Sequence, residues 1–321
     1  MEDTSHIGQE SYFQVADGVW GFKDIFVNVY FVSTSNGWVL VDAGLKSAHK
    51  KIKDVARQLF GADVAPLAVV LTHGHFDHVG SIRSLLKDWN VPVYAHALEI
   101  PYLTGKSSYP PADSTVGGGL LSVVADLYPD EPIDLSGVVK SLSFNGEIPV
   151  LPDWRYIHTP GHSPGHISLW RETDKVLIVG DAFVTTKQES VLSTLMQIKI
   201  LSGPPKYFTY DWQQAKTSVD KLAQLTPDVV ATGHGKPMRG PQMQQDLMKL
   251  AADFEKKAIP THGRYIANPA VTNKYGVVSL PPKTLGIIEK VTWGMGFLAM
   301  VGLGFALARN TGNRRKPSLG W

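Results

Sequence analysis

The stretch LTHGHFDHVGS, residues 71–81, holds three of the chain's 11 histidines and one aspartate within six positions. It lies between a short apolar run and a helix-like segment. In an extended loop that leaves a strand, side chains at i and i+2 project to the same side, so His73 and His75 can bind one ion together. Asp77 and His78 come where the chain turns into the next helix and can face a neighbouring point. Because imidazole and carboxylate are ligands for zinc and similar divalent ions, the stretch predicts two adjacent metal positions.

Other histidines and aspartates lie at the ends of further predicted strands. His162 lies in TPGHSPGH, Asp181 in VGDAF and His234 in ATGHGKP. Functional residues of α/β folds gather where buried strands give way to loops, so we expect these three side chains to complete the site. A carboxylate at Asp181 can bridge two ions. Asp42 and His166 are expected to support the ligands by hydrogen bonds without touching metal.

Hydrophobic periodicity predicts that strands and helices alternate along most of the chain. The expected strands are 25–32, 38–41, 67–71, 91–95, 155–158, 166–170, 176–179 and 229–231. The expected helices are 48–60, 81–89, 213–225 and 242–257. We expect a catalytic domain at 1–260, with a long loop or helical insertion at about 101–150, a linker at 261–284 and a hydrophobic tail at 285–321.

The tail contains the uncharged run 291–308, which is 18 residues long and is flanked by Lys290 and Arg309. A helix of that length spans about 27 Å, close to the about 30 Å of a bilayer core. Two interpretations stay open: a C-terminal membrane anchor, or a hydrophobic helix packed on the domain or in an oligomer interface. Because the N-terminus has no apolar signal segment, we expect a cytoplasmic catalytic domain, associated with the membrane through the tail in the first case.

Composition excludes several classes of function. The net charge of +2 and the 19% charged residues do not indicate a nucleic-acid partner, so a small-molecule substrate is expected. The absence of cysteine excludes disulfides, thiolate metal sites and cysteine nucleophiles. The pattern GHSPG at 161–165 fits a serine nucleophile elbow, but Pro164 lacks the N–H that the oxyanion would need.

The motifs THGHFDH, TPGHSPGH, GDAF and TGHG together resemble those of the metallo-β-lactamase superfamily, and the resemblance runs from about residue 26 to 257. It implies an α/β fold, a four-layer αββα sandwich with metals at the sheet edges, followed here by a C-terminal hydrophobic helix. It also implies that the first metal is held by His73, His75 and His162, and the second by Asp77, His78 and His234, with Asp181 bridging them. The longer strings resemble a bacterial group whose substrates are poorly defined.

The branches of the superfamily leave several activities open. True β-lactamases generally lack the bridging aspartate, so β-lactamase activity is expected to be secondary at most. Lactonases share the seven ligands, but many carry a tyrosine where this chain has Val184. A thioester hydrolase of the glyoxalase II type, a mononuclear-iron persulfide dioxygenase and a non-catalytic membrane-tethered scaffold remain alternatives. The residues expected to line the substrate pocket are Phe183, Tyr109, Tyr207 and Tyr210.

The leading hypothesis is a dinuclear hydrolase of carboxylic esters or lactones. Two divalent ions, with zinc expected first and manganese, iron or cobalt open, would share a hydroxide that attacks a carbonyl. Asp77 is the expected catalytic residue, because it lies beside that hydroxide and can carry the proton to the leaving group.

Overall fold

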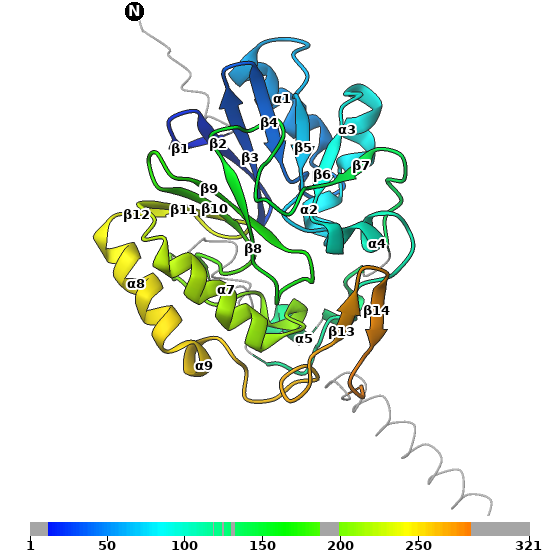
Figure 1. The fold of residues 1–321 in the computed structure, drawn as a ribbon, viewed down its shortest axis with the longest axis vertical. Helices are drawn as coiled ribbons and strands as arrows, with labels where there is room; N and C mark the ends of the chain where they lie inside the picture. Colours follow the sequence, from blue (N-terminus) through cyan, green and yellow to red (C-terminus); the bar gives the residue numbers. More distant parts are fainter. Residues whose placement is uncertain (1–11, 118, 124, 130–131, 187–198, 284–321) are drawn as a thin grey trace, which may run out of the picture.

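The computed structural model describes residues 12–117, 119–123, 125–129, 132–186 and 199–283. Two β-sheets face each other and helices cover their outer faces, which gives four layers (Figure 1). This arrangement confirms the predicted αββα sandwich. The run 291–308, expected to form a hydrophobic helix, lies outside the described residues. Among the residues that the structure describes, none of the helices has the length and apolar character needed to cross a bilayer.

The first sheet has seven strands in the order in which they occur in the chain. They are β1 (Phe13–Ala16), β2 (Val19–Asp24), β3 (Val27–Thr34), β4 (Gly37–Val41), β5 (Ala68–Val70), β6 (Val93–Ala95) and β7 (Val139–Ser141). Strands β1 to β4 pair antiparallel, and β4 to β7 pair parallel. The outer face is covered by α1 (His49–Phe60) and α3 (Ile82–Asp88), and the short α2 (Phe76–Val79) follows β5.

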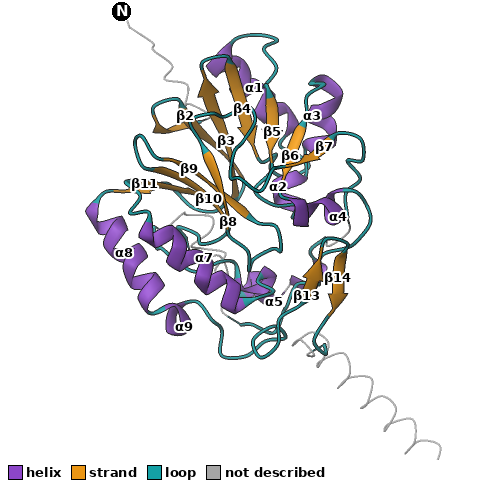
Figure 2. Cartoon of the chain, viewed as in Figure 1, coloured by secondary structure: helices purple, strands orange, loops and turns teal. Residues whose placement is uncertain are grey.

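The second sheet has five strands in the order β12-β11-β10-β9-β8. They are β8 (Arg155–His158), β9 (Ile167–Arg171), β10 (Val176–Gly180), β11 (Val229–Thr232) and β12 (Met238–Arg239). Its outer face is covered by α7 (Trp212–Gln224) and α8 (Pro241–Ala252), and α9 (Phe254–Lys257) follows α8 (Figure 2). The single helix expected at 242–257 is therefore two helices, which meet at Asp253.

Alternation along the strands builds the layers, because successive side chains of a strand point to opposite faces. In β3, Val29 and Phe31 pack with α1 and α3, whereas Tyr30 and Val32 pack between the two sheets. In β10, Leu177 and its neighbour two residues on pack with α7 and α8. Both sheets are thus buried on two sides, which explains their nearly continuous apolar sequences.

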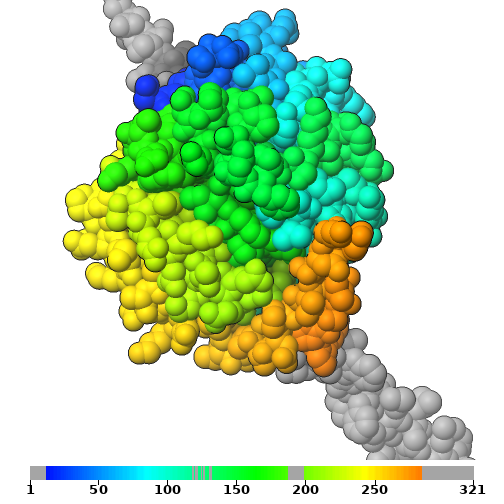
Figure 3. All heavy atoms as spheres, viewed as in Figure 1, coloured from blue at the N-terminus to red at the C-terminus, as the bar shows by residue number. Residues whose placement is uncertain are grey.

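The region 101–150 contains α4 (Ile100–Leu103), α5 (Leu120–Val123) and β7, which extends the first sheet at its edge. The range 261–284, expected as a linker, contains the hairpin β13 (Val271–Asn273) and β14 (Gly276–Ser279). This C-terminal segment lies against the 101–117 surface, as Figure 3 shows. Tyr265 is buried and its hydroxyl donates to the Pro111 carbonyl at 2.7 Å, and the Val277 N–H donates to Ser107 Oγ at 3.1 Å.

Candidate metal centre

The predicted ligands meet where the two sheets present the ends of their strands. His73, Asp181 and His234 follow β5, β10 and β11, and His162 lies in the loop after β8. Parallel strands such as β10 and β11 end at the same edge, so the residues that follow them become neighbours. The structure thus brings together all seven residues of the expected ligand set, every one of them less than 9% exposed.

His73, His75 and His162 form a cluster that we call the three-histidine group. His162 Nε2 lies 3.2 Å from His73 Nε2 and 3.0 Å from His75 Nδ1. Burial lowers the pKa of all three imidazoles, that of His75 to about 3, so they are neutral near pH 7. Three neutral nitrogens aimed at one point form a donor set that suits a divalent cation.

Asp77, His78 and His234 form a second cluster, which we call the mixed group. His234 Nε2 lies 3.4 Å from Asp77 Oδ2, and His78 Nε2 lies 4.0 Å from the same oxygen. Asp181 Oδ2 lies 3.0 Å from His234 Nε2 and 3.5 Å from His162 Nε2. One carboxylate oxygen therefore reaches a nitrogen of each group.

The unsatisfied polar atoms of the cluster fit a bound metal. His78 Nε2 and Asp181 Oδ1 are buried and have no hydrogen-bond partner. Burial opposes protonation of His78, but Asp42, Asp181 and Asp77 outweigh it and raise its pKa well above the usual value. Three carboxylates thus favour positive charge at this point, and a divalent ion supplies it.

Asp42 and His166 lie where their expected supporting roles require. Asp42 Oδ2 accepts a hydrogen bond from His78 Nδ1 at 2.8 Å, and Asp42 Oδ1 accepts one from the Thr72 N–H at 2.8 Å. His166 Nε2 accepts from the Asp181 N–H at 2.8 Å. The bond to Asp42 leaves Nε2 of His78 facing the cluster.

The remaining histidine of the mixed group is held by backbone from the opposite sheet. His234 Nδ1 donates to the Phe26 carbonyl at 2.9 Å, which leaves Nε2 facing the cluster. Asn28 Nδ2 donates to the carbonyls of Thr232 and Gly235 at 2.9 and 2.6 Å. These bonds attach the turn that contains His234 to the beginning of β3.

Glu99 supports the three-histidine group, and this role was not expected from the sequence. It is fully buried, and its Oε2 accepts from the Gly74 N–H at 3.0 Å and from the Tyr109 hydroxyl. Its Oε1 accepts from Ser163 Oγ at 2.9 Å and from the Gly165 N–H at 2.7 Å. A single carboxylate therefore joins the loop of His73 and His75 to the loop of His162.

Two glycines of the motifs are required by close contacts. A Cβ at Gly74 would lie 2.5 Å from the Tyr109 hydroxyl oxygen, and a Cβ at Gly233 would lie 2.1 Å from Asp181 Oδ1. Gly74 lies between two ligands in HGH and Gly233 precedes one in TGHG, so these motifs were the available signal. No sequence signal pointed to Glu99, because the donors that it contacts in the two ligand loops lie 25 to 66 residues away along the chain.

A cavity of about 230 Å³ opens beside the cluster. It is lined by Phe26, His75, Phe76, Asp77, Tyr128, Asp181, Pro205, Tyr207, Phe208 and His234. Of the four residues expected to line a pocket, Tyr207 lies in this wall. The Tyr210 hydroxyl lies 3.2 Å from His75 Nε2, and Tyr109 lies behind the ligand loop, bonded to Glu99. Phe183 lies elsewhere, because its side chain is buried in the core beneath α7 and α8.

Comparison with known proteins establishes the family. A family model described as the metallo-beta-lactamase superfamily matches residues 23–234. The chain belongs to this superfamily, and the resemblance found in its motifs is confirmed.

The relatives include the probable metallo-hydrolase YflN of Bacillus subtilis, which is 45% identical over 74% of this chain and 92% of its own length. The probable metallo-hydrolase YybB of the same organism is 27% identical over 65% of this chain and 81% of its own. Among solved structures, BJP-1, a subclass B3 metallo-beta-lactamase of Bradyrhizobium japonicum, is 21% identical with a TM-score of 0.54. That match covers 77% of this chain and 92% of the other, and it shows the fold alone.

Proposed function

We propose that the chain is a dinuclear metal-dependent hydrolase that acts on the carbonyl of a carboxylic ester or lactone. The position of Asp181 supports this most, because its Oδ2 lies within 3.5 Å of a nitrogen from the three-histidine group and of one from the mixed group. A carboxylate shared in this way suits two ions held close together. Zinc fits the nitrogen and oxygen donors, as do manganese, iron and cobalt.

Two such ions would make hydroxide available near neutral pH and would polarise a carbonyl oxygen. The side chains then have separate tasks. Asp77 lines the cavity, and burial raises its pKa above the usual value. A buried carboxylate at this wall is placed to hold the proton of the attacking water and to release it to the leaving oxygen.

The mixed group favours two ions over the single iron of a persulfide dioxygenase. Such an enzyme needs only one set of protein ligands, whereas this chain places Asp77, His78 and His234 as a second buried set. The seven assembled side chains also oppose a non-catalytic scaffold, since buried unpaired carboxylates and imidazoles destabilise a fold that has no use for them.

The test is elemental analysis of the full chain purified without added metal, followed by hydrolysis assays with lactones, esters, thioesters, β-lactams and phosphodiesters. We expect two metal ions per chain and turnover of esters or lactones. One iron per chain, together with oxygen uptake on glutathione persulfide, would overturn the proposal.

A further inference from the structure

We infer that the substrate is small and uncharged and carries an aromatic or other apolar group next to its carbonyl. This inference rests on the proposed hydrolase function. It comes from the cavity wall beside the metal centre, which the motifs do not describe.

One side of the cavity is a continuous aromatic wall made of Phe76, Tyr128, Tyr207 and Phe208. The ring of Phe208 lies 5.7 Å from that of Tyr128 and 5.1 Å from that of Tyr207, and the Tyr128 ring lies 5.8 Å from that of Phe76. Phe208 also stacks on the ligand His75, with 4.6 Å between ring centroids. A carbonyl held at the metal centre therefore has aromatic carbon as its immediate neighbour.

The ring of Phe26 lies beside the other end of the centre. It stacks on His234 with 5.9 Å between ring centroids and also lines the cavity. Aromatic side chains thus adjoin one histidine of each ligand group. Burial of an apolar substrate group against these rings would contribute to binding at about 25 cal/mol per Å² of apolar surface.

The charged residues of the cavity disfavour an anionic group remote from the reacting carbonyl. Among the described residues that line it, none is Lys or Arg, and the carboxylates are those of Asp77 and Asp181. A substrate carboxylate remote from the reacting carbonyl would lie against the aromatic wall, where none of the described lining residues offers a cation to pair with it. The charge of the two ions would be offset by their own ligands, Asp77 and Asp181 among them. Glutathione thioesters carry carboxylates of this kind, so they fit the cavity poorly.

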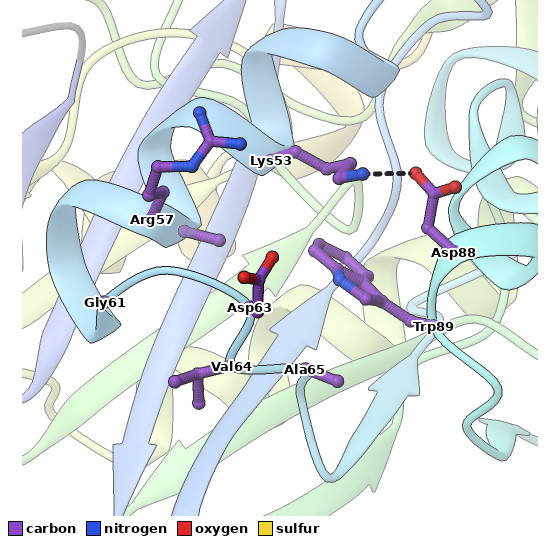
Figure 4. A pocket seen from close by; sticks show the side chains of 9 residues that line it. Lys53, Arg57, Gly61, Asp63, Val64, Ala65, Asp88 and Trp89 are labelled. Atoms are coloured by element: carbon purple, nitrogen blue, oxygen red, sulfur yellow. Dashed lines mark hydrogen bonds and ion pairs between the residues drawn. The ribbon is translucent and has the colours of Figure 1, made fainter.

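A second hollow differs from this cavity because cationic side chains line part of it (Figure 4). It lies beside α1, has a volume of about 170 Å³ and is lined in part by Lys53, Arg57 and Trp89. Its cations are already paired, since Lys53 Nζ lies 2.5 Å from an oxygen of Asp88 and Arg57 lies 3.2 Å from Asp54. None of its lining residues belongs to the ligand set.

The size of the catalytic cavity also limits the substrate. Its volume of about 230 Å³ is below the roughly 300–1,000 Å³ typical of pockets for drug-sized ligands. A substrate with a single ring and a short ester fits a cavity of this volume, whereas a tripeptide conjugate would extend beyond the cavity.

The first test compares three methyl esters with the metal-loaded full chain: methyl phenylacetate and its para-carboxy and para-carbamoyl derivatives. The carbamoyl ester matches the carboxy ester in shape but is uncharged. We expect kcat/KM to be at least about 100-fold lower for the carboxy ester than for the carbamoyl ester, because its charge is buried unpaired. Equal or faster hydrolysis of the carboxy ester would overturn the inference and leave the hydrolase function intact.

A charge placed in the wall gives the second test. Tyr128→Lys adds a cation beside Phe76 and Phe208, and Leu127→Lys adds the same charge at a side chain that is 76% exposed. Tyr128→Lys should raise the carboxy-to-carbamoyl ratio of kcat/KM by about 10-fold, and Leu127→Lys should leave it unchanged. An unchanged ratio in a folded, metal-loaded Tyr128→Lys protein would contradict the inference.

An inert ligand separates this inference from the proposed function. Benzyl ethyl ketone has the shape of methyl phenylacetate but cannot be hydrolysed, and calorimetry would measure its binding. If the ketone binds, its para-carboxy derivative does not, and no ester is turned over, the cavity inference stands and the hydrolase function fails. If neither ketone binds while charged esters are hydrolysed, the cavity inference fails alone.

Discussion

The two halves of the metal centre are built from different chemistry. The three-histidine group presents only neutral imidazole nitrogens, whereas the mixed group gathers carboxylates around His78 and His234. Their supports differ in the same way. Glu99 holds the first group through loop backbone and a serine, and Asp42 and the Phe26 carbonyl hold imidazoles of the second directly.

This difference means that the two halves can be disturbed separately. A residue that fixes loops should alter the geometry of the three-histidine group, and a residue that fixes one imidazole should alter the mixed group. Among the ligands, Asp181 is the exception, since it lies near nitrogens of both groups. The following predictions test this separation, beginning with the largest effect.

Asp181→Ala should disturb both halves of the metal centre at once. Removing the shared carboxylate should cause the loss of at least one metal ion and reduce turnover at least about 1,000-fold, equivalent to about 4 kcal/mol. Elemental analysis and steady-state kinetics measure both effects. Asp174→Ala, which removes a partly exposed carboxylate paired with Arg171, is the control. Full occupancy with unchanged turnover would refute the bridging role.

Glu99→Gln should weaken the three-histidine group selectively. The amide keeps the shape of the side chain, but its NH2 cannot accept from the N–H donors of Gly74 or Gly165. Metal affinity at this group should fall about 10- to 100-fold, as measured by cobalt titration followed by absorption spectra.

The same titration on Glu147→Gln, an exposed glutamate, should match the unmodified chain. Equal loss of affinity at both metal positions in Glu99→Gln would show that Glu99 supports the fold rather than one half of the centre.

Asp42→Asn should weaken the mixed group by about 10- to 100-fold in metal affinity, and the three-histidine group less, because Asp42 bonds His78 directly but reaches His73 only through Thr72. Asp42 has φ of 63°, a left-handed conformation that asparagine also tolerates, so the backbone should persist. Asp63→Asn is a matched control, because Asp63 has φ of 61° and is exposed. If cobalt titration of Asp42→Asn shows loss at the three-histidine group only, the assignment of supports is wrong.

Tyr210→Phe tests a finer contact of the three-histidine group. His75 Nε2 lies 3.2 Å from the Tyr210 hydroxyl. Loss of the hydroxyl should leave a buried ring N–H of His75 without this partner. The cost of about 1 kcal/mol should reduce turnover about fivefold. Tyr275→Phe, at an exposed tyrosine of the β13–β14 hairpin, should have no effect. No change in Tyr210→Phe would show that this contact does not orient His75.

Acid should loosen the His162 loop through a neighbouring histidine pair. His96 and His158 stack with 4.1 Å between ring centroids, and His158 Nε2 donates to the Pro164 carbonyl at 2.9 Å. Burial lowers the pKa of both, that of His96 to about 4. The unfolded chain therefore binds protons more tightly, and stability falls as pH drops from about 6.5 towards about 4.

His96→Asn removes this titration and keeps an acceptor for the Leu98 N–H. The decrease in Tm between neutral and acidic pH should shrink by about 2 °C or more, as measured by calorimetry. His49→Asn, a histidine paired with Asp88 at the surface, is the control. An identical pH profile in His96→Asn would exclude the pair as the acid-sensitive element.

Much of the layered fold could be predicted because it depends on local periodicity. Apolar runs and helical spacing placed β3, β4 and α1 to within a few residues. The edge strands β7 and β12 were not expected, since short strands with exposed residues carry little apolar signal. The ligand types were also readable, because metal chemistry restricts them to histidine and carboxylate at strand ends.

Phe183 and Phe208 show what local signals could not decide. Phe183 follows Asp181 closely, yet its side chain turns into the core beneath α7 and α8. Phe208 lies far from every motif in sequence, yet it stacks on His75. Side-chain direction after a strand depends on the turn that follows, which packing determines.

By itself, the sequence determined which types of side chain can bind metal and most of the longer segments that form strands and helices, because both depend on residue type and short-range spacing. Only the tertiary structure decided that Glu99 joins two ligand loops, that Asp181 reaches both groups, and that aromatic side chains line the cavity. These contacts join residues far apart in the chain, so they exist only once the two sheets have packed together.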